Sequence, residues 1–140
     1  MIKKFFFFKT LFICLFLTLS VFAKNTNLFN EGKTLFDKEK YDKSRIFFER
    51  DIVLNPKNKK SYLYLAKIFK KNEKDEEEEV NLNNVLLLDP KNEEAIYLLI
   101  LLKIKQSNYY ETSELIKKFN IICKSFCSKK KEKKEKFSKL

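Results

Sequence analysis

Apolar side chains recur between residues 25 and 126 with the spacing of amphipathic helices, and short polar stretches separate the runs. Asn25 or Thr26 can cap the first helix, whose apolar stripe begins at Leu28. A single Gly and two Pro leave little material for β-turns, so the whole chain is predicted to be helical. The first predicted helix runs from this cap to a polar corner at residues 38–40, and the others span 41–54, 61–71, 75–88, 93–105 and 109–122.

The pattern has a period of 34 residues. Asn55-Pro56-Lys57-Asn58 returns 34 places later as Asp89-Pro90-Lys91-Asn92, with a leucine before each copy. A proline pushes the residue before it out of the α region, so each copy predicts a helix end. This frame divides the chain into repeats 25–58, 59–92 and 93–126, and its twenty-fourth place, expected in the core, holds Phe48, Leu82 and Ile116.

Two helices per 34-residue unit, with a proline after the second, resemble the tetratricopeptide repeat. The first repeat matches best, with the family's residue types at Gly32, Tyr41, Ser44, Phe48 and Pro56. The second has Glu78 where the family has a small residue, so we expect looser packing of its helix pair. The third is the most divergent, with Ile100 and Thr112 at the small positions and Lys124 in place of the proline.

The resemblance implies an all-α fold, a right-handed helical-hairpin solenoid of about three units in a domain spanning 24–127. A divergent last repeat suits a terminal unit, which receives no neighbour. We expect the last helix to continue past Ile122 and to cap the core. Its expected inner stripe is Ile116, Phe119, Cys123, Phe126 and Cys127. The acidic run 75–79 fits the positive end of a helix better than a calcium loop.

In this family the first helices of the units form an inner wall that binds peptides. The resemblance therefore implies that places two, five, nine and twelve of each repeat face a ligand. The lysines among them would favour an acidic and apolar segment of another protein. The family's clamp for a terminal carboxylate does not match at Phe29 and Lys33, so that specificity is not carried over. An alternative is that some of these positions belong to the core. The candidate partner-binding residues are Phe29, Lys33, Phe36, Leu63, Lys67, Lys70, Tyr97 and Leu101.

The residues that catalysis usually needs are scarce. Without histidine, no Ser or Cys has the usual general base beside it. One glycine cannot build a phosphate-binding loop. We therefore expect no enzyme, no cofactor and no metal site.

Residues 1–23 combine lysines with a long apolar run ending in Val21-Phe22-Ala23, which predicts a secretory signal peptide and an exported protein of the periplasm or cell envelope. The alternative is an uncleaved membrane anchor over residues 5–23. Of the net charge of +11, the tail 128–140 supplies seven Lys against two Glu. This tail is expected to be disordered and could touch an anionic membrane weakly. No nucleic-acid partner is expected.

Two cysteines, Cys123 and Cys127, remain after the predicted cleavage. In an oxidising compartment they suggest a disulfide, although four-residue spacing on a helix aligns the Cβ atoms poorly. Free thiols and redox or soft-metal chemistry stay open. The sequence thus favours a non-enzymatic interaction scaffold. The alternatives are a small redox or metal-handling envelope protein using these cysteines, and a structural spacer in an envelope complex.

Overall fold

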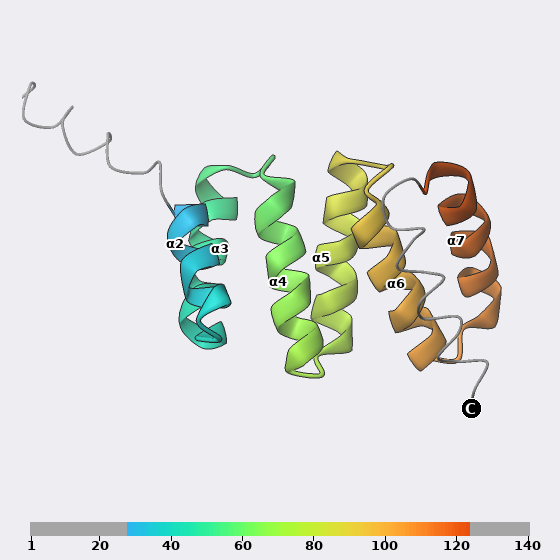
Figure 1. The fold of residues 1–140 in the computed structure, drawn as a ribbon, viewed down its shortest axis with the longest axis horizontal. Helices are drawn as coiled ribbons and strands as arrows, with labels where there is room; N and C mark the ends of the chain where they lie inside the picture. Colours follow the sequence, from blue (N-terminus) through green and yellow to red (C-terminus); the bar gives the residue numbers. More distant parts are fainter. Residues whose placement is uncertain (1–27, 124–140) are drawn as a thin grey trace, which may run out of the picture.

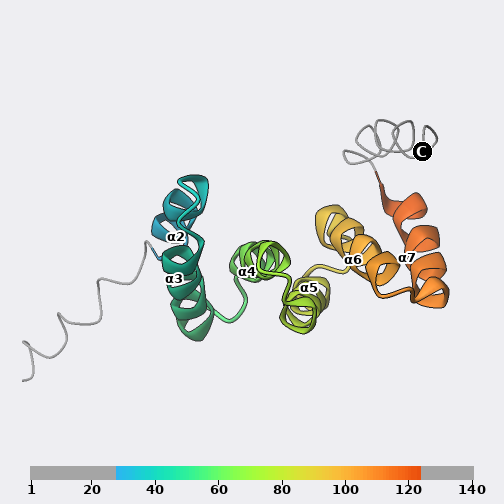
Figure 2. The same ribbon diagram turned by 90° about the horizontal axis from the view of Figure 1, so that it is seen from below.

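The computed structural model describes residues 28–123, and within this range the chain consists of helices and short turns without strands. Consecutive helices run antiparallel as hairpins, and the hairpins follow one another along a single row (Figures 1 and 2). The predicted all-α solenoid is confirmed. The helices are α2 (Leu28–Asp37), α3 (Tyr41–Leu54), α4 (Lys59–Lys71), α5 (Asp75–Leu88), α6 (Glu93–Lys105) and α7 (Tyr109–Ile122).

In the turn inside each hairpin, one residue at the same place of the repeat has a left-handed backbone conformation. Glu39, Glu73 and Ser107 have φ angles of 57°, 57° and 56° and lie 34 residues apart. In the second hairpin the Lys74 N–H donates to the Phe69 carbonyl at 2.9 Å, and the other two turns repeat this bond. It is the long hydrogen bond of a Schellman motif, which satisfies a carbonyl left free at the helix end. The 34-residue period is therefore a period of backbone geometry as well as of sequence.

The loops between hairpins carry the two prolines. Pro56 and Pro90 follow the ends of α3 and α5, and the asparagine two residues later caps the next helix. The Asn58 side chain accepts a hydrogen bond from the Lys60 N–H at 3.2 Å, and Asn92 accepts from the Ala95 N–H at 3.0 Å. Helix α4 consequently begins at Lys59, two residues before the predicted start.

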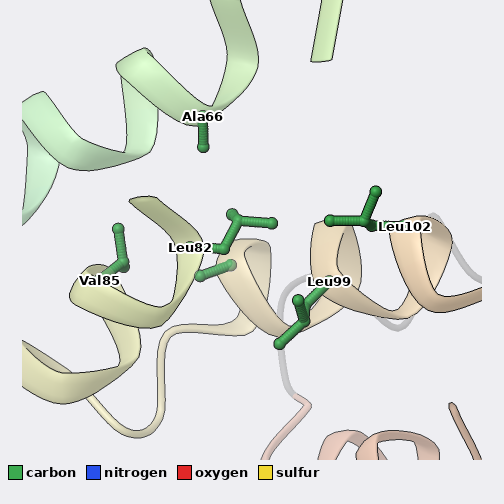
Figure 3. Close-up of a cluster of buried hydrophobic side chains, with 6 residues drawn as sticks. Ala66, Leu82, Val85, Leu99 and Leu102 are labelled. Atoms are coloured by element: carbon green, nitrogen blue, oxygen red, sulfur yellow. The ribbon is translucent and has the colours of Figure 1, made fainter. Parts of the chain in front are cut away.

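The core consists of three clusters in series, each shared by consecutive helices, because no single hairpin can bury its apolar side alone. Figure 3 shows the central cluster, where side chains of α4, α5 and α6 meet. Leu82 is fully buried there, as its place in the frame predicted. The clusters are Phe48, Leu65, Ile68 and Phe69; Ala66, Leu82, Val85, Ala95, Leu99 and Leu102; and Ile96, Ile100 and Phe119.

The first hairpin packs closely through its small residues. Gly32 is buried, and a Cβ added there would lie 2.8 Å from a ring carbon of Phe48. The buried Ser44 hydroxyl donates to the Gly32 carbonyl at 2.7 Å. The close contact inferred from these two residues is therefore present.

Polar side chains also occupy buried positions. Asp51 is 3% exposed and accepts hydrogen bonds from the Asn58 amide at 2.6 Å, the Asn55 amide at 3.1 Å and the Ser61 hydroxyl. These bonds fix the loop between α3 and α4, because a buried carboxylate needs partners. Glu78 is 2% exposed, so the looser packing expected of the second hairpin is not found.

Two expectations about α7 are wrong. Ile116 is 37% exposed and therefore does not belong to the core as its place in the frame predicted. The helix ends at Ile122, and Cys123 has an extended backbone, so the helix does not continue as predicted. The predicted partner of Cys123, Cys127, lies outside the described residues, as do the signal peptide or anchor and the tail. No helix in the described range has the length and apolarity needed to cross a membrane.

Candidate functional site

The eight predicted partner-binding residues lie on α2, α4 and α6, the first helices of the three hairpins. Seven of them are half-buried, Lys70 is exposed, and none is fully buried. We call these eight residues, together with Tyr64 and Lys60, the inner surface. Half-burial leaves part of each side chain accessible while its remainder packs against the core.

The first half of the inner surface is an aromatic cluster. The rings of Phe29 and Phe36 meet the Tyr64 ring edge-on, at centroid distances of 5.7 and 4.9 Å. Tyr64 also stacks on the buried Phe48 at 5.1 Å. These contacts join α2 to α4 and hold the exposed parts of the rings in fixed positions. Rigid aromatic side chains of this kind give a ligand contact area at low entropic cost.

The sequence argument missed Tyr64, because it considered only places two, five, nine and twelve of each repeat. Helical spacing could have identified it, since Tyr64 follows Lys60 by four residues and precedes Lys67 by three. Residues three and four apart share a helix face. The structure places both lysines beside this cluster.

The lysines of the inner surface already have partners within the chain. The Lys60 ammonium lies 5.8 Å from the centroid of the Phe29 ring. Lys67 lies 4.8 Å from that of Tyr64 and 2.8 Å from a carboxylate oxygen of Glu94. From its place in the repeat we expected an exposed Lys67, and this prediction is wrong, because its side chain is only 25% exposed. The Lys67–Glu94 pair joins α4 to α6.

Lys33 also lies beside this aromatic cluster. Its ammonium is 2.5 Å from the Asp37 carboxylate. The hydrogen bond to Asp37 raises the pKa of Lys33 above its ordinary value, and the nearby Tyr64 adds to the increase. The positive charges of this half of the surface are therefore held around the aromatic rings.

The third repeat contributes a more apolar part of the inner surface. The Tyr97 ring lies 6.2 Å from that of the buried Phe119, so Tyr97 joins α6 to α7. Leu101 is half-buried one turn further along, and Ile104 is 49% exposed. The predicted residues thus lie on the first helices of three consecutive hairpins. Their role in binding remains a prediction.

Lys103 forms a buried ionic network that the sequence argument did not identify. Its side chain is 6% exposed, and its ammonium lies 2.6 Å from Glu79 and 3.0 Å from Glu111. Burial acts to lower the pKa of Lys103, but the hydrogen bonds to these two carboxylates outweigh it and raise the pKa. Both acids lie on neighbouring helices, so the network connects α5, α6 and α7 and is structural.

Among residues 28–123, no group of three His, Cys, Asp or Glu side chains is placed to hold a metal ion. Cys123 is half-buried and disulfide-bonded. Its predicted pairing with Cys127 stays a prediction. Two open surface hollows lie on the first hairpin, away from the inner surface. One is lined by Leu28, Ile46, Glu49, Arg50, Val53 and Leu54, the other by Asn30, Glu31, Thr34, Leu35 and Phe47.

Comparison with solved structures identifies the fold. The chain is similar to the second tetratricopeptide-repeat domain of Spaghetti (RPAP3), solved with the HSP90 peptide SRMEEVD; the TM-score is 0.66 at 18% identity, covering 72% of this chain and 94% of that one. It is also similar to the Sgt2 tetratricopeptide-repeat domain from Aspergillus fumigatus, with a TM-score of 0.60 at 18% identity, covering 69% of this chain and 64% of that one. No protein-family model and no curated protein matches the sequence. The chain therefore has the tetratricopeptide-repeat fold.

Proposed function

We propose that this protein is a non-enzymatic scaffold or adaptor of the periplasm or cell envelope that binds a segment of another protein along its inner surface. The observation that carries the proposal is the row of half-buried aromatic and leucine side chains on α2, α4 and α6, with lysines beside them. The similar RPAP3 domain was solved with a bound peptide, which supports a peptide as ligand.

The contacts favour an extended ligand with apolar and acidic residues. Apolar side chains of the ligand would cover Phe29, Leu63 and Tyr97, one on each hairpin, and remove their exposed parts from water. Carboxylates would meet the lysines around the aromatic cluster and would increase the association rate. The pair between Lys67 and Glu94 limits this attraction in the middle of the surface. We therefore expect the strongest preference for acidic residues beside Lys60.

The structure determines which variant tests binding most clearly. Lys67→Glu is a poor probe, because it would place a second carboxylate beside Glu94 and destabilise the fold. Lys70→Glu is a poor probe as well, because Lys70 attracts the buried Glu78 carboxyl. Lys60→Glu changes an exposed residue of α4 beside the aromatic cluster. Lys38→Glu is the matched control, since it makes the same change in net charge at an exposed position elsewhere.

The experiment compares pull-downs from the native cell envelope using the wild-type chain and the two single variants. The captured protein is identified, and its binding segment is titrated as a synthetic peptide. We expect Lys60→Glu to weaken affinity at least tenfold, or roughly 1.4 kcal/mol, with helicity and melting temperature unchanged. Equal affinity for this variant and its control would place the interface elsewhere.

Location has its own test, N-terminal sequencing of the protein from its native host. We expect a mature chain that starts at Lys24 in the soluble envelope fraction. A chain that starts at Met1 in the membrane fraction would instead support the anchor over residues 5–23.

A further inference from the structure

One edge of the molecule brings together the last turns of α3, α5 and α7 and the two proline-containing loops. Figure 1 shows the loops after α3 and α5 and the end of α7 along the same, upper side of the row. This arrangement follows from the antiparallel hairpins, since every second helix ends on the same side. We call it the helix-end edge.

The helix-end edge exposes a large aliphatic side chain in each repeat. Val53, Leu87 and Ile121 are 79%, 81% and 84% exposed and occupy the same place in the 34-residue frame. The residues after the first two, Leu54 and Leu88, are also exposed. Single exposed aliphatic residues need no explanation, but a row of them indicates an interaction site.

Positive charges accompany this row. Lys57 and Lys91 are exposed in the loops that follow Val53 and Leu87. Arg50 and Lys118 are exposed three residues before Val53 and Ile121, which places them on the same helix faces. The row therefore alternates aliphatic side chains with cations.

Two acids near this edge pair with cations that do not belong to the row. Asp89 pairs with Lys59 at 2.7 Å, and Glu49 pairs with Arg45 at 3.3 Å.

We propose that the helix-end edge binds the surface of a membrane that contains anionic lipids. Aliphatic side chains at three helix ends can enter the acyl boundary, while lysines and arginine contact phosphate groups. A second copy of the chain fits less well, because the facing edges would bring like charges together. The site is separate from the inner surface, so the protein could bind its partner and a membrane at the same time.

The test uses the absence of tryptophan from the chain. Leu87→Trp places a single fluorescent reporter on the helix-end edge, and Tyr110→Trp places one at the start of α7, on the opposite edge. The two positions are matched, because Leu87 and Tyr110 are each 81% exposed. The full chain with either reporter is mixed with phosphatidylcholine vesicles, with or without phosphatidylglycerol, some of them containing brominated lipids.

We expect the emission of Trp at position 87 to shift to shorter wavelength and to be quenched by brominated lipids, only with phosphatidylglycerol present. The reporter at position 110 should remain in water. Lys57→Gln with Lys91→Gln, added to the Leu87→Trp chain, should weaken binding roughly thirtyfold, because each lysine near an anionic surface contributes about 1 kcal/mol.

Three results would overturn the proposal. A reporter at position 87 that stays in water would show that the edge does not touch the membrane, even if the leader or tail does. Equal responses at positions 87 and 110 would show no preference for the edge. A shift at position 87 that depends on protein concentration without vesicles would identify a second copy as the occupant.

Discussion

Glu78 is the residue at which a small change should stabilise the fold most. It is 2% exposed, and its Oε1 atom has no hydrogen-bond partner. Burial raises the pKa of the Glu78 carboxyl above its ordinary value; Lys70 and Lys105 oppose the increase, and Asp75 adds to it. Lys105 is already paired with Asp75 at 2.6 Å, so it compensates Glu78 only partly. Ionisation of Glu78 thus places an incompletely solvated charge inside the second hairpin.

Glu78→Gln removes this charge and keeps the shape of the side chain. A buried polar group without a partner costs about 1–3 kcal/mol, and more when it is charged. Gln keeps part of that cost and loses the attraction of Lys70, so we expect a gain of about 1–2 kcal/mol at pH 7. For a domain of this size each kcal/mol raises the melting temperature by roughly 4–8 °C. Glu76→Gln, at an exposed position in the same helical turn, is the control, because both changes remove a carboxylate that interacts with the positive end of α5.

The dependence on pH separates this explanation from a simple gain in helix propensity. A carboxyl whose pKa is higher in the folded state binds more protons there. The contribution of Glu78 to wild-type stability is therefore greatest below the unfolded pKa of Glu and is lost as pH rises through the folded pKa. Urea denaturation at pH 7 and at pH 4 should show the Glu78→Gln advantage shrinking at the lower pH. An equal advantage at both pH values, or a less stable variant at pH 7, would refute the reasoning.

Two further predictions concern packing and backbone geometry. Leu82→Ala should lower the free energy of unfolding by about 2–5 kcal/mol, because it leaves a cavity in the central cluster. Leu87→Ala, at an 81% exposed position, should change it by no more than about 0.5 kcal/mol. Urea denaturation distinguishes the two variants, and equal losses would mean that the core is assigned wrongly. Glu73→Gly should stabilise the protein by about 0.5–1 kcal/mol, because the φ angle of 57° is unstrained only for glycine. Lys118→Gly, at an exposed position inside α7, should instead destabilise the protein by up to about 1 kcal/mol. A loss of melting temperature at position 73 would contradict the strain argument.

The sequence by itself determined the repeat and the ends of most helices. Pro56 and Pro90 act on the residue before them, and Asn58 and Asn92 cap the helix that follows within three residues. These effects are local, so they can be read without a fold. The period then assigned Leu82 to the core, and the family resemblance assigned the eight candidate partner-binding residues to the first helices of the three units.

Only the tertiary structure decided the environments at which the repeats differ. Ile116 occupies the same place as the buried Leu82, yet it is 37% exposed, because within residues 28–123 no helix follows α7 as α6 follows α5. Lys103 is buried, although lysine is mostly a surface residue, because Glu79 and Glu111 approach it from neighbouring helices. Lys67 is neutralised by Glu94, which lies 27 positions away and comes close only when two hairpins stack. Burial and ion pairing depend on which side chains of the next repeat contact a residue, and the place of that residue in the period does not specify them.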